Sequence, residues 1–191
     1  MRIITGKAKG ARIEAPEGDA TRPTSERIKE AIFSSINFDI EGRRVLDLFA
    51  GCGQMGLEAM SRGAESATFV DSSAEAIGYV KANAKRAGFF TDCRYLVSDY
   101  RNYIRKASGR DTYNLVFIDP PYSAGMCGDA VKKLLGASLA DDGCIFVIES
   151  EGDADILGSV TALGSFDVLK STRYGKKTQV NILLYRGGET S

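Results

Sequence analysis

Four consecutive residues combine the groups that could hold an aromatic amine. Asp119, Pro120, Pro121 and Tyr122 directly follow the apolar run 115–118, which has the composition of a buried strand. Each proline fixes φ and lacks a donor, and Pro120 also disfavours helical geometry at Asp119. The turn is therefore stiff and presents a carboxylate, free carbonyl oxygens and an aromatic ring at one place, which together suit a planar exocyclic amino group. The same residues could instead form an ordinary proline-rich turn after a strand.

A glycine-rich loop earlier in the chain could hold a cofactor. Residues 47–56 read Asp-Leu-Phe-Ala-Gly-Cys-Gly-Gln-Met-Gly, which contains G-x-G-x-x-G, and Asp71 lies 20 residues beyond Gly51. This spacing is typical of dinucleotide sites in which the acid binds a ribose hydroxyl. Asp47 favours a different ligand, because a carboxylate at the turn would repel a pyrophosphate but attract an ammonium group and tolerate a sulfonium. The loop therefore favours S-adenosylmethionine over NAD.

A further acid, Asp99, follows the third expected strand. It lies where an adenine amino group would need an acceptor if a nucleoside crosses the strand ends. It could equally cap the following helix, as Asp71, Ser72 or Ser73 could cap the helix after the second strand.

The elements around these residues alternate between short apolar strands and helices, which predicts a parallel sheet covered on both faces. Near the C-terminus, two strands flank a turn containing glycine and lysines, which predicts an antiparallel hairpin at the end of the sheet. The fold class is therefore α/β and Rossmann-like. The expected strands are 45–49, 67–70, 94–97, 115–118 and 144–148, the helices 55–62, 74–87, 100–106 and 129–135, and the hairpin strands 166–171 and 179–185.

The N-terminal residues precede this alternation and form an added arm. Residues 1–15 have the pattern of a small hairpin, 16–24 that of a loop, and a helix is expected from about residue 25 to residue 37. We expect an arm over 1–24 and a main domain over 25–191. Residues 1–12 contain no acid but four bases, which could contact phosphates or could simply be solvated: Arg2, Lys7, Lys9 and Arg12.

The composition excludes several other classes of function. The 191 residues carry 25 Lys plus Arg, 25 Asp plus Glu and no histidine, so imidazole catalysis is impossible. The four cysteines form no C-x-x-C pair, which argues against zinc and a disulfide framework and suits a reducing cytoplasm. With no signal-like or membrane-spanning run, we expect a cytoplasmic protein that needs neither metal nor membrane.

The two motifs together resemble those of class I S-adenosylmethionine-dependent amino-methyltransferases. The resemblance is narrower to the bacterial RsmD family and runs from residue 1 to about residue 186. It is carried by residues 1–6, by Arg22-Pro23-Thr24 with Arg27 and Glu30, and by residues 56–59 and 149–151. It implies a seven-stranded Rossmann-like domain with an N-terminal hairpin that helps bind RNA. It also implies methylation of N2 of a guanine in small-subunit (16S) ribosomal RNA.

The resemblance also assigns roles to individual residues. Asp47, Gly51 and Gly53 would hold the methionine part of the cofactor, Asp71 its ribose and Asp99 its adenine. Phe49, Ala50, Ser72, Tyr100 and Asp119 would complete the cofactor site. Asp119 to Tyr122 would bind the target base, with Arg22 and Thr24 beside it and the four arm bases contacting RNA. The loop departs from the family where Cys52 and Gln54 replace small residues.

Other functions remain compatible with these motifs. A D-P-P-Y turn could serve a methyltransferase acting on DNA adenine or on protein glutamine, and the fold could carry an NAD-dependent oxidoreductase. An inactive RNA-binding module is a further alternative. The favoured interpretation is a monomer whose partner is ribosomal RNA or the small ribosomal subunit.

Overall fold

A seven-stranded sheet forms the centre of the chain. The computed structural model describes residues 1–15, 26–121, 124–151, 156–175 and 178–187. The strand order is β3-β2-β1-β4-β5-β7-β6; β7 runs antiparallel to both of its neighbours, β5 and β6, and the other neighbouring pairs are parallel. The expected Rossmann-like fold class with a C-terminal antiparallel hairpin is therefore confirmed. The strands are β1 Arg44–Asp47, β2 Ser66–Asp71, β3 Cys93–Val97, β4 Tyr113–Ile118, β5 Ala140–Glu151, β6 Phe166–Tyr174 and β7 Thr178–Tyr185.

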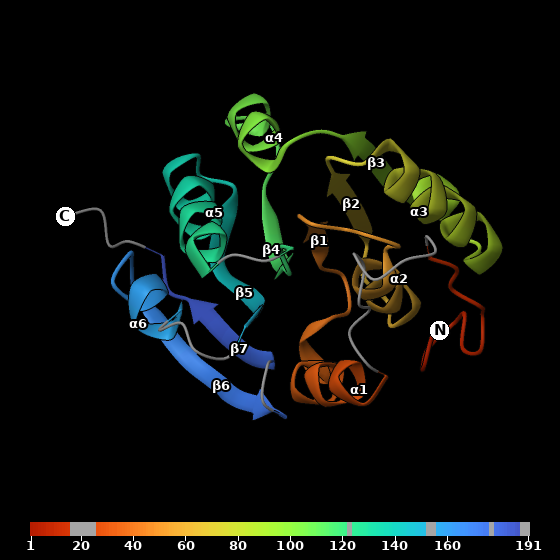
Figure 1. Cartoon of the computed structure of the whole chain (residues 1–191), viewed down its shortest axis with the longest axis horizontal. Helices are drawn as coiled ribbons and strands as arrows, with labels where there is room; N and C mark the ends of the chain where they lie inside the picture. Colours follow the sequence, from red (N-terminus) through yellow and green to blue (C-terminus); the bar gives the residue numbers. More distant parts are fainter. Residues whose placement is uncertain (16–25, 122–123, 152–155, 176–177, 188–191) are drawn as a thin grey trace.

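Helices cover both faces of this sheet (Figure 1). α1 (Glu26–Ser35), α2 (Gln54–Ser61) and α3 (Ala74–Ala87) lie on one side, and α4 (Tyr100–Ala107), α5 (Ala124–Gly136) and α6 (Ile156–Thr161) lie on the other. A hydrophobic core lies on each face of the sheet. Successive residues of a strand pack into the two cores in turn, because side chains alternate across a strand. Val45 and Leu115 pack against α1 to α3, whereas Leu46 and Val116 pack against α4 to α6. Within the described ranges, no helix has the length and apolar character needed to cross a bilayer.

The expected elements differ from the observed ones mainly at their ends. α1 ends at Ser35 and is followed by a 3-10 turn, Asn37–Asp39, while α5 begins at Ala124, five positions earlier than expected. β5 begins at Ala140, where a register shift separates its first pairing to Tyr113 from the rest. Residues 141–143 are polar or glycine and so gave no strand pattern. α6 was not predicted, because only Ile156 and Val160 of its six residues are buried.

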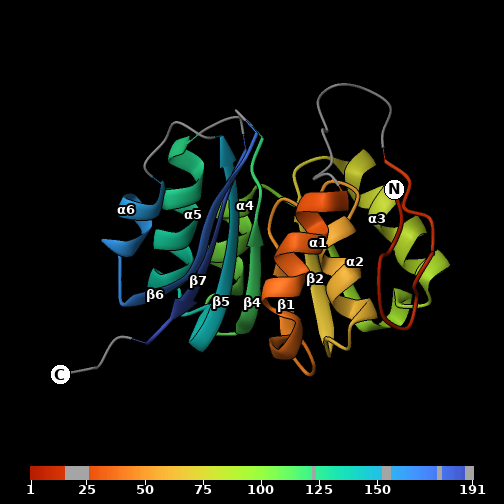
Figure 2. The same ribbon diagram turned by 90° about the horizontal axis from the view of Figure 1, so that it is seen from below.

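The N-terminal hairpin packs on the outer side of α2 and α3 (Figure 2). An antiparallel bridge joins Arg2 to Arg12, and the amide of Ile3 donates to the carbonyl of Ala11 at 2.9 Å. The side chains of Ile3 and Ile13 are buried in the same core as the apolar residues of α2 and α3. The hairpin is thus part of the packed body of the protein rather than a free extension.

Candidate active site

Four of the acids singled out by the sequence lie at the carboxyl edge of the sheet, namely Asp47, Asp71, Asp99 and Asp119. β1, β2, β3 and β4 are parallel neighbours, so the segments that follow them meet at one edge. The chain passes from β1 outward to β2 and β3 and then returns to place β4 on the other side of β1. Ligands of open α/β sheets bind at such a switch point. The cofactor loop and the D-P-P-Y turn follow the two strands that flank it.

The cofactor loop turns sharply from β1 into α2. Gly53 precedes the first residue of α2 with φ of 79°, a left-handed conformation that glycine adopts without strain, and its carbonyl accepts the amide of Leu57 at 2.9 Å. Gly56 packs so closely on β2 that a Cβ there would lie 2.4 Å from the ring of Phe69. The glycine pattern therefore sets both the turn and the tight packing of α2 on the sheet.

Asp47 lies beneath this loop rather than on its surface. Its side chain is buried, and one carboxylate oxygen accepts the amide of Gly56 at 3.0 Å. Burial raises the pKa of Asp47 to about 7, against the smaller lowering effect of that hydrogen bond. A cation placed near this carboxylate would favour its ionised form.

Asp71 joins the ends of β1 and β2. One of its oxygens accepts the amide of Gly51 at 2.9 Å, and the other accepts the amide of Ser73 at 2.8 Å. Ser73, and not Ser72, caps α3 by accepting the amide of Ala76, while Ser72 is exposed. The carboxylate of Asp71 therefore fixes the position of the glycine turn.

The end of β3 supplies a helix cap and an aromatic contact. Asp99 is exposed and caps α4 by accepting the amides of Arg101 at 2.9 Å and Asn102 at 3.3 Å. Tyr100 is buried, donates its hydroxyl to Asp129 at 2.6 Å and packs against Phe49, with 5.1 Å between ring centroids. The phenol of Tyr100 is thus engaged with α5, and its ring supports the segment after β1.

The D-P-P-Y turn begins directly after β4. Asp119 and Pro121 are exposed and Pro120 is half-buried. Burial raises the pKa of the Cys127 thiol, on α5, to about 12, with a smaller contribution from the negative charge of Asp119. Tyr122, Arg22 and Thr24, which the sequence also predicted for this site, lie outside the described residues.

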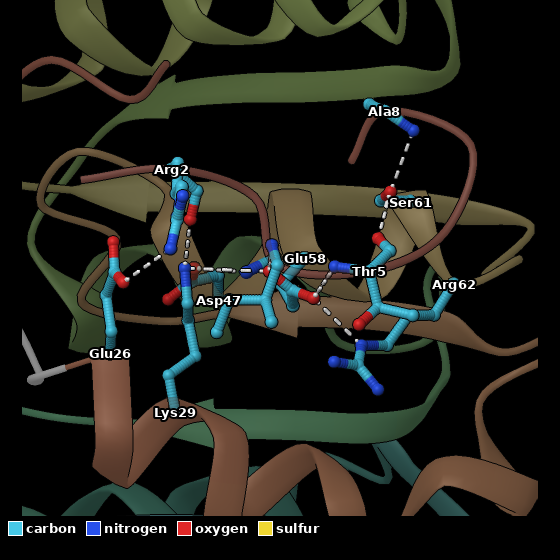
Figure 3. A network of polar contacts seen from close by, with 11 residues as sticks. Arg2, Thr5, Ala8, Glu26, Lys29, Asp47, Glu58, Ser61 and Arg62 are labelled. Carbon is cyan, nitrogen blue, oxygen red and sulfur yellow. Dashed lines mark hydrogen bonds and ion pairs between the residues drawn. The ribbon is translucent and has the colours of Figure 1, made fainter. Parts of the chain in front are cut away.

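A buried ion pair holds the N-terminal hairpin to α2 (Figure 3). The carboxylate of Glu58 accepts the amides of Ile4 at 2.7 Å and Thr5 at 3.1 Å, and its oxygen lies 3.5 Å from the ammonium of Lys29. Lys29 also donates to the carbonyl of Arg2 at 2.7 Å. Both charged side chains have 0% exposure. Burial lowers the pKa of Lys29, although the adjacent carboxylate opposes this. No sequence motif predicted that Lys29 and Glu58 would anchor the hairpin.

A second set of hydrogen bonds joins the tip of the hairpin to the C-terminal end of α2. The hydroxyl of Ser61 donates to the carbonyl of Thr5 at 2.6 Å and accepts the amide of Ala8 at 2.9 Å. A Cβ on Gly6 would lie 1.8 Å from the carbonyl oxygen of Ser61, so no larger residue fits there. The basic side chains expected to meet RNA all come from exposed residues of this hairpin: Arg2, Lys7, Lys9 and Arg12.

A separate cavity of about 460 Å³ opens at the opposite, amino edge of β1 to β3. Its lining includes three arginines and three acids, namely Arg44, Arg94, Arg110, Glu65, Asp92 and Asp111. Arg94 pairs with Asp111 at 2.7 Å, so the charges of this cavity are largely balanced. The predicted site, in contrast, lies at the carboxyl edge, where the motif residues follow the strands. Among the described residues, no group of three or more metal-binding side chains comes together.

Comparison with known proteins identifies the family. The family described as "Conserved hypothetical protein 95" matches residues 1–184. Ribosomal RNA small subunit methyltransferase D of Escherichia coli K12 is 30% identical over 153 residues, which cover 79% of this chain and 75% of that protein. The chain therefore belongs to the family described as "Conserved hypothetical protein 95". A Bacillus subtilis family relative, named "Putative rRNA methyltransferase YlbH", is 42% identical over 123 residues, 64% of this chain and 67% of the relative.

Solved structures show the same fold along nearly the whole chain. The structure titled "Putative methyltransferase yhhF from Escherichia coli" superposes with a TM-score of 0.83 at 23% identity and covers 97% of this chain and 98% of its own. The Thermus thermophilus 16S rRNA N2 G1207 methyltransferase RsmC, solved with AdoMet and guanosine, gives a TM-score of 0.67 at 16% identity. That comparison covers 87% of this chain and 45% of the other. The fold is that of the class I methyltransferases.

Proposed function

We propose that this protein transfers a methyl group from S-adenosylmethionine to the exocyclic N2 of a guanine in 16S ribosomal RNA. The observation that carries the proposal is that β1 and β4 are parallel neighbours, so the glycine loop after β1 and residues 119–121 after β4 lie at the same switch point. Membership of a family that includes ribosomal RNA methyltransferases supports this assignment.

The residues at the glycine loop fit S-adenosylmethionine. Asp47 supplies negative charge for the ammonium group, and Asp71 lies at the end of β2, where it can reach the ribose. The buried Oε1 atom of Gln54, at the start of α2, has no hydrogen-bond partner among the residues that the structure describes. A donor of the bound cofactor could satisfy it, and this gives the departure at Gln54 a role. Asp99 at the edge is accessible to an adenine amino group.

The D-P-P-Y turn would hold the target base. The N2 amine of guanine is a weak nucleophile, because its lone pair is delocalised into the ring. The carboxylate of Asp119 and the carbonyl of Pro120 would accept its two hydrogens and favour a pyramidal nitrogen, while Tyr122 would stack on the base with roughly 1–3 kcal/mol. Bound S-adenosylmethionine supplies an electrophilic methyl group on its sulfonium.

Catalysis would then rest on positioning. Fixed acceptors stabilise the positive charge that develops on nitrogen, and Pro120 and Pro121 keep them rigid. The amine proton leaves after methyl transfer, and the exposed carboxylate of Asp119 offers it a path to water. A guanine in structured RNA must leave its stack to reach this turn.

The hairpin would supply the remaining RNA contacts. Lys7, Lys9 and Arg12 are exposed on an element that is fixed to the main body through Glu58 and Ser61. Fixed cations lose little freedom when they meet phosphates, so this arrangement favours a positioning role in RNA binding.

The test is to map methylated positions in 16S ribosomal RNA from cells with and without the protein, and after incubation of naked RNA or small subunits with purified protein. We expect one guanine to gain an N2 methyl. Asp119→Ala should lower kcat by about 10²–10³-fold, while S-adenosylhomocysteine still binds. Labelled methyl appearing instead in adenine of DNA or in protein glutamine, or wild-type activity of Asp119→Ala, would refute the proposal.

A further inference from the structure

Asn83, on α3, connects two parts of the molecule that the proposed function uses separately. Its side-chain amide donates to the carbonyl of Glu14 at 2.7 Å and to the carbonyl of Cys52 at 3.0 Å. Its Oδ1 accepts the amide of Glu14 at 3.0 Å. Asn83 has 0% exposure. One buried side chain thus bonds both the end of the N-terminal hairpin and the cofactor loop.

The partners of Asn83 fix the orientation of its amide. The two carbonyls can only accept, and the backbone amide of Glu14 can only donate, so Nδ2 and Oδ1 cannot be exchanged. Among similar side chains, only asparagine offers an acceptor and two donors at this length. An aspartate would place negative charge against two carbonyl oxygens and would lose both donors.

On the cofactor side, Asn83 supports the turn from below. Cys52 lies between Gly51 and Gly53, and a Cβ on Gly53 would lie 3.0 Å from a methyl group of Val80, one turn before Asn83 on α3. The loop therefore rests on this part of α3, and the Cys52 carbonyl is its hydrogen-bonded contact with the helix.

On the hairpin side, Asn83 works together with Arg86. The guanidinium of Arg86 donates to the carbonyl of Arg12 at 3.1 Å and to Oδ1 of Asn83 at 3.0 Å, and it pairs with the carboxylate of Glu14 at 3.1 Å. These bonds join Asn83 and Arg86 to the second strand of the hairpin, which carries Arg12. A shift of that strand would therefore also move or break the hydrogen bonds of Asn83.

We propose that Asn83 is a positioning residue that couples RNA binding by the hairpin to cofactor binding by the glycine loop. The inference rests on the proposed function. A ligand that orders either the hairpin or the glycine loop also orders the other through Asn83. The second ligand then loses less conformational entropy on binding. The coupling must be reciprocal: RNA tightens cofactor binding by the same factor by which the cofactor tightens RNA binding.

The experiment measures this factor on the full chain. The Kd of S-adenosylhomocysteine is determined by equilibrium dialysis with and without saturating transcribed 16S ribosomal RNA, and the Kd of that RNA by filter binding with and without S-adenosylhomocysteine. We expect wild-type protein to show a factor of at least ~5 in both directions, and Asn83→Asp to show a factor near one. A wild-type factor of one, or an unchanged factor in Asn83→Asp, would overturn the inference.

Ser61→Ala is the matched control. It removes two hydrogen bonds to the hairpin without touching the cofactor loop. It should keep the wild-type affinity for S-adenosylhomocysteine in free protein and retain most of the coupling. Loss of coupling in Ser61→Ala equal to that in Asn83→Asp would also overturn the inference, since general loosening of the hairpin would then suffice.

A second measurement covers the case in which Asn83→Asp does not fold. In wild-type protein, S-adenosylhomocysteine should slow hydrogen exchange at the amide of Glu14, which bonds Asn83, and unchanged exchange there would refute the coupling. Failure of the proposed function would look different. A protein that binds RNA and S-adenosylhomocysteine cooperatively but transfers no methyl group would refute the activity and leave the coupling intact.

Discussion

The two halves of the carboxyl edge differ in how their carboxylates are held. At the ends of β1 and β2, Asp47 and Asp71 accept backbone amides of the glycine loop, and Asp47 is buried. At the end of β4, Asp119 is an exposed residue followed by two prolines, which restrict the backbone after it. The half that we propose for the cofactor (the cofactor half) is therefore built around carboxylates that bind the backbone, whereas the half that we propose for the base (the base half) has its carboxylate on an exposed residue.

The proposed cofactor half has an additional support in the N-terminal hairpin. The N-terminal hairpin is anchored behind the loop by Glu58, Lys29 and Asn83, all of which are fully buried. Such a preorganised site would suit a small cofactor. In the proposed function, the base belongs to a large RNA and would need the approach path that an exposed turn offers.

The largest expected effect tests the hairpin anchor. Glu58→Ala leaves the ammonium of Lys29 buried without its partner, and breaking a buried pair in this way costs about 3–5 kcal/mol. We expect the free energy of unfolding in urea to fall by that amount. Glu30→Ala, which removes an exposed acid from the same helix as Lys29, should change it by less than about 0.5 kcal/mol. Equal effects of the two substitutions would mean that the anchor is unimportant.

The next effect concerns the glycine turn. Asp71→Ala removes the acceptor of two backbone amides, those of Gly51 and Ser73. Leaving such donors unsatisfied costs about 1–3 kcal/mol, so we expect S-adenosylhomocysteine to bind roughly 5- to 150-fold more weakly. Asp92→Ala, at an exposed acid before β3, serves as the control. If calorimetry shows unchanged affinity of Asp71→Ala for S-adenosylhomocysteine, Asp71 does not support cofactor binding.

A pH dependence follows from the raised pKa of Asp47. Its value of about 7 exceeds the ordinary 3.8, so folded protein binds this proton more tightly than the unfolded chain does. The corresponding stability is complete below about pH 4 and is lost as pH rises to about 7. A cofactor ammonium prefers the ionised form, so affinity for S-adenosylhomocysteine should rise as pH increases through about 7. Asp47→Asn should abolish that rise, and an identical pH profile for the variant would contradict the role of Asp47.

The smallest effect concerns the exposed charges of the hairpin. Replacing Lys7 and Lys9 by alanine should weaken RNA binding across sequences and reduce the slope of log Kd against log salt by about one to two. The unfolding free energy should not change, because both side chains are exposed. Lys81→Ala together with Lys85→Ala, on the exposed side of α3, gives a control of equal charge. A slope identical to that of wild type would mean that Lys7 and Lys9 are merely solvated.

The sequence by itself determined the α/β class, the glycine turn and the acids at the strand ends. These features depend on local physics: apolar runs that alternate with helical patterns, glycines that allow left-handed φ, and prolines that fix a turn. The hairpin pairing of residues 1–15 was also predictable, since its strands are close in sequence. α6 and the first residues of β5 were not, because their few apolar positions give no period.

Only the tertiary structure decided what the buried polar residues do. Lys29, Glu58 and Asn83 lie on helices where a charged or amide residue is normally solvated, so no spacing rule marks them as buried. Their partners are backbone atoms of a hairpin 27 to 69 positions away in the chain. A contact of that kind exists only once α1, α2, α3 and the hairpin have packed on the same face of the sheet, because the backbone amides and carbonyls that they bind are present in every residue and carry no sequence signal.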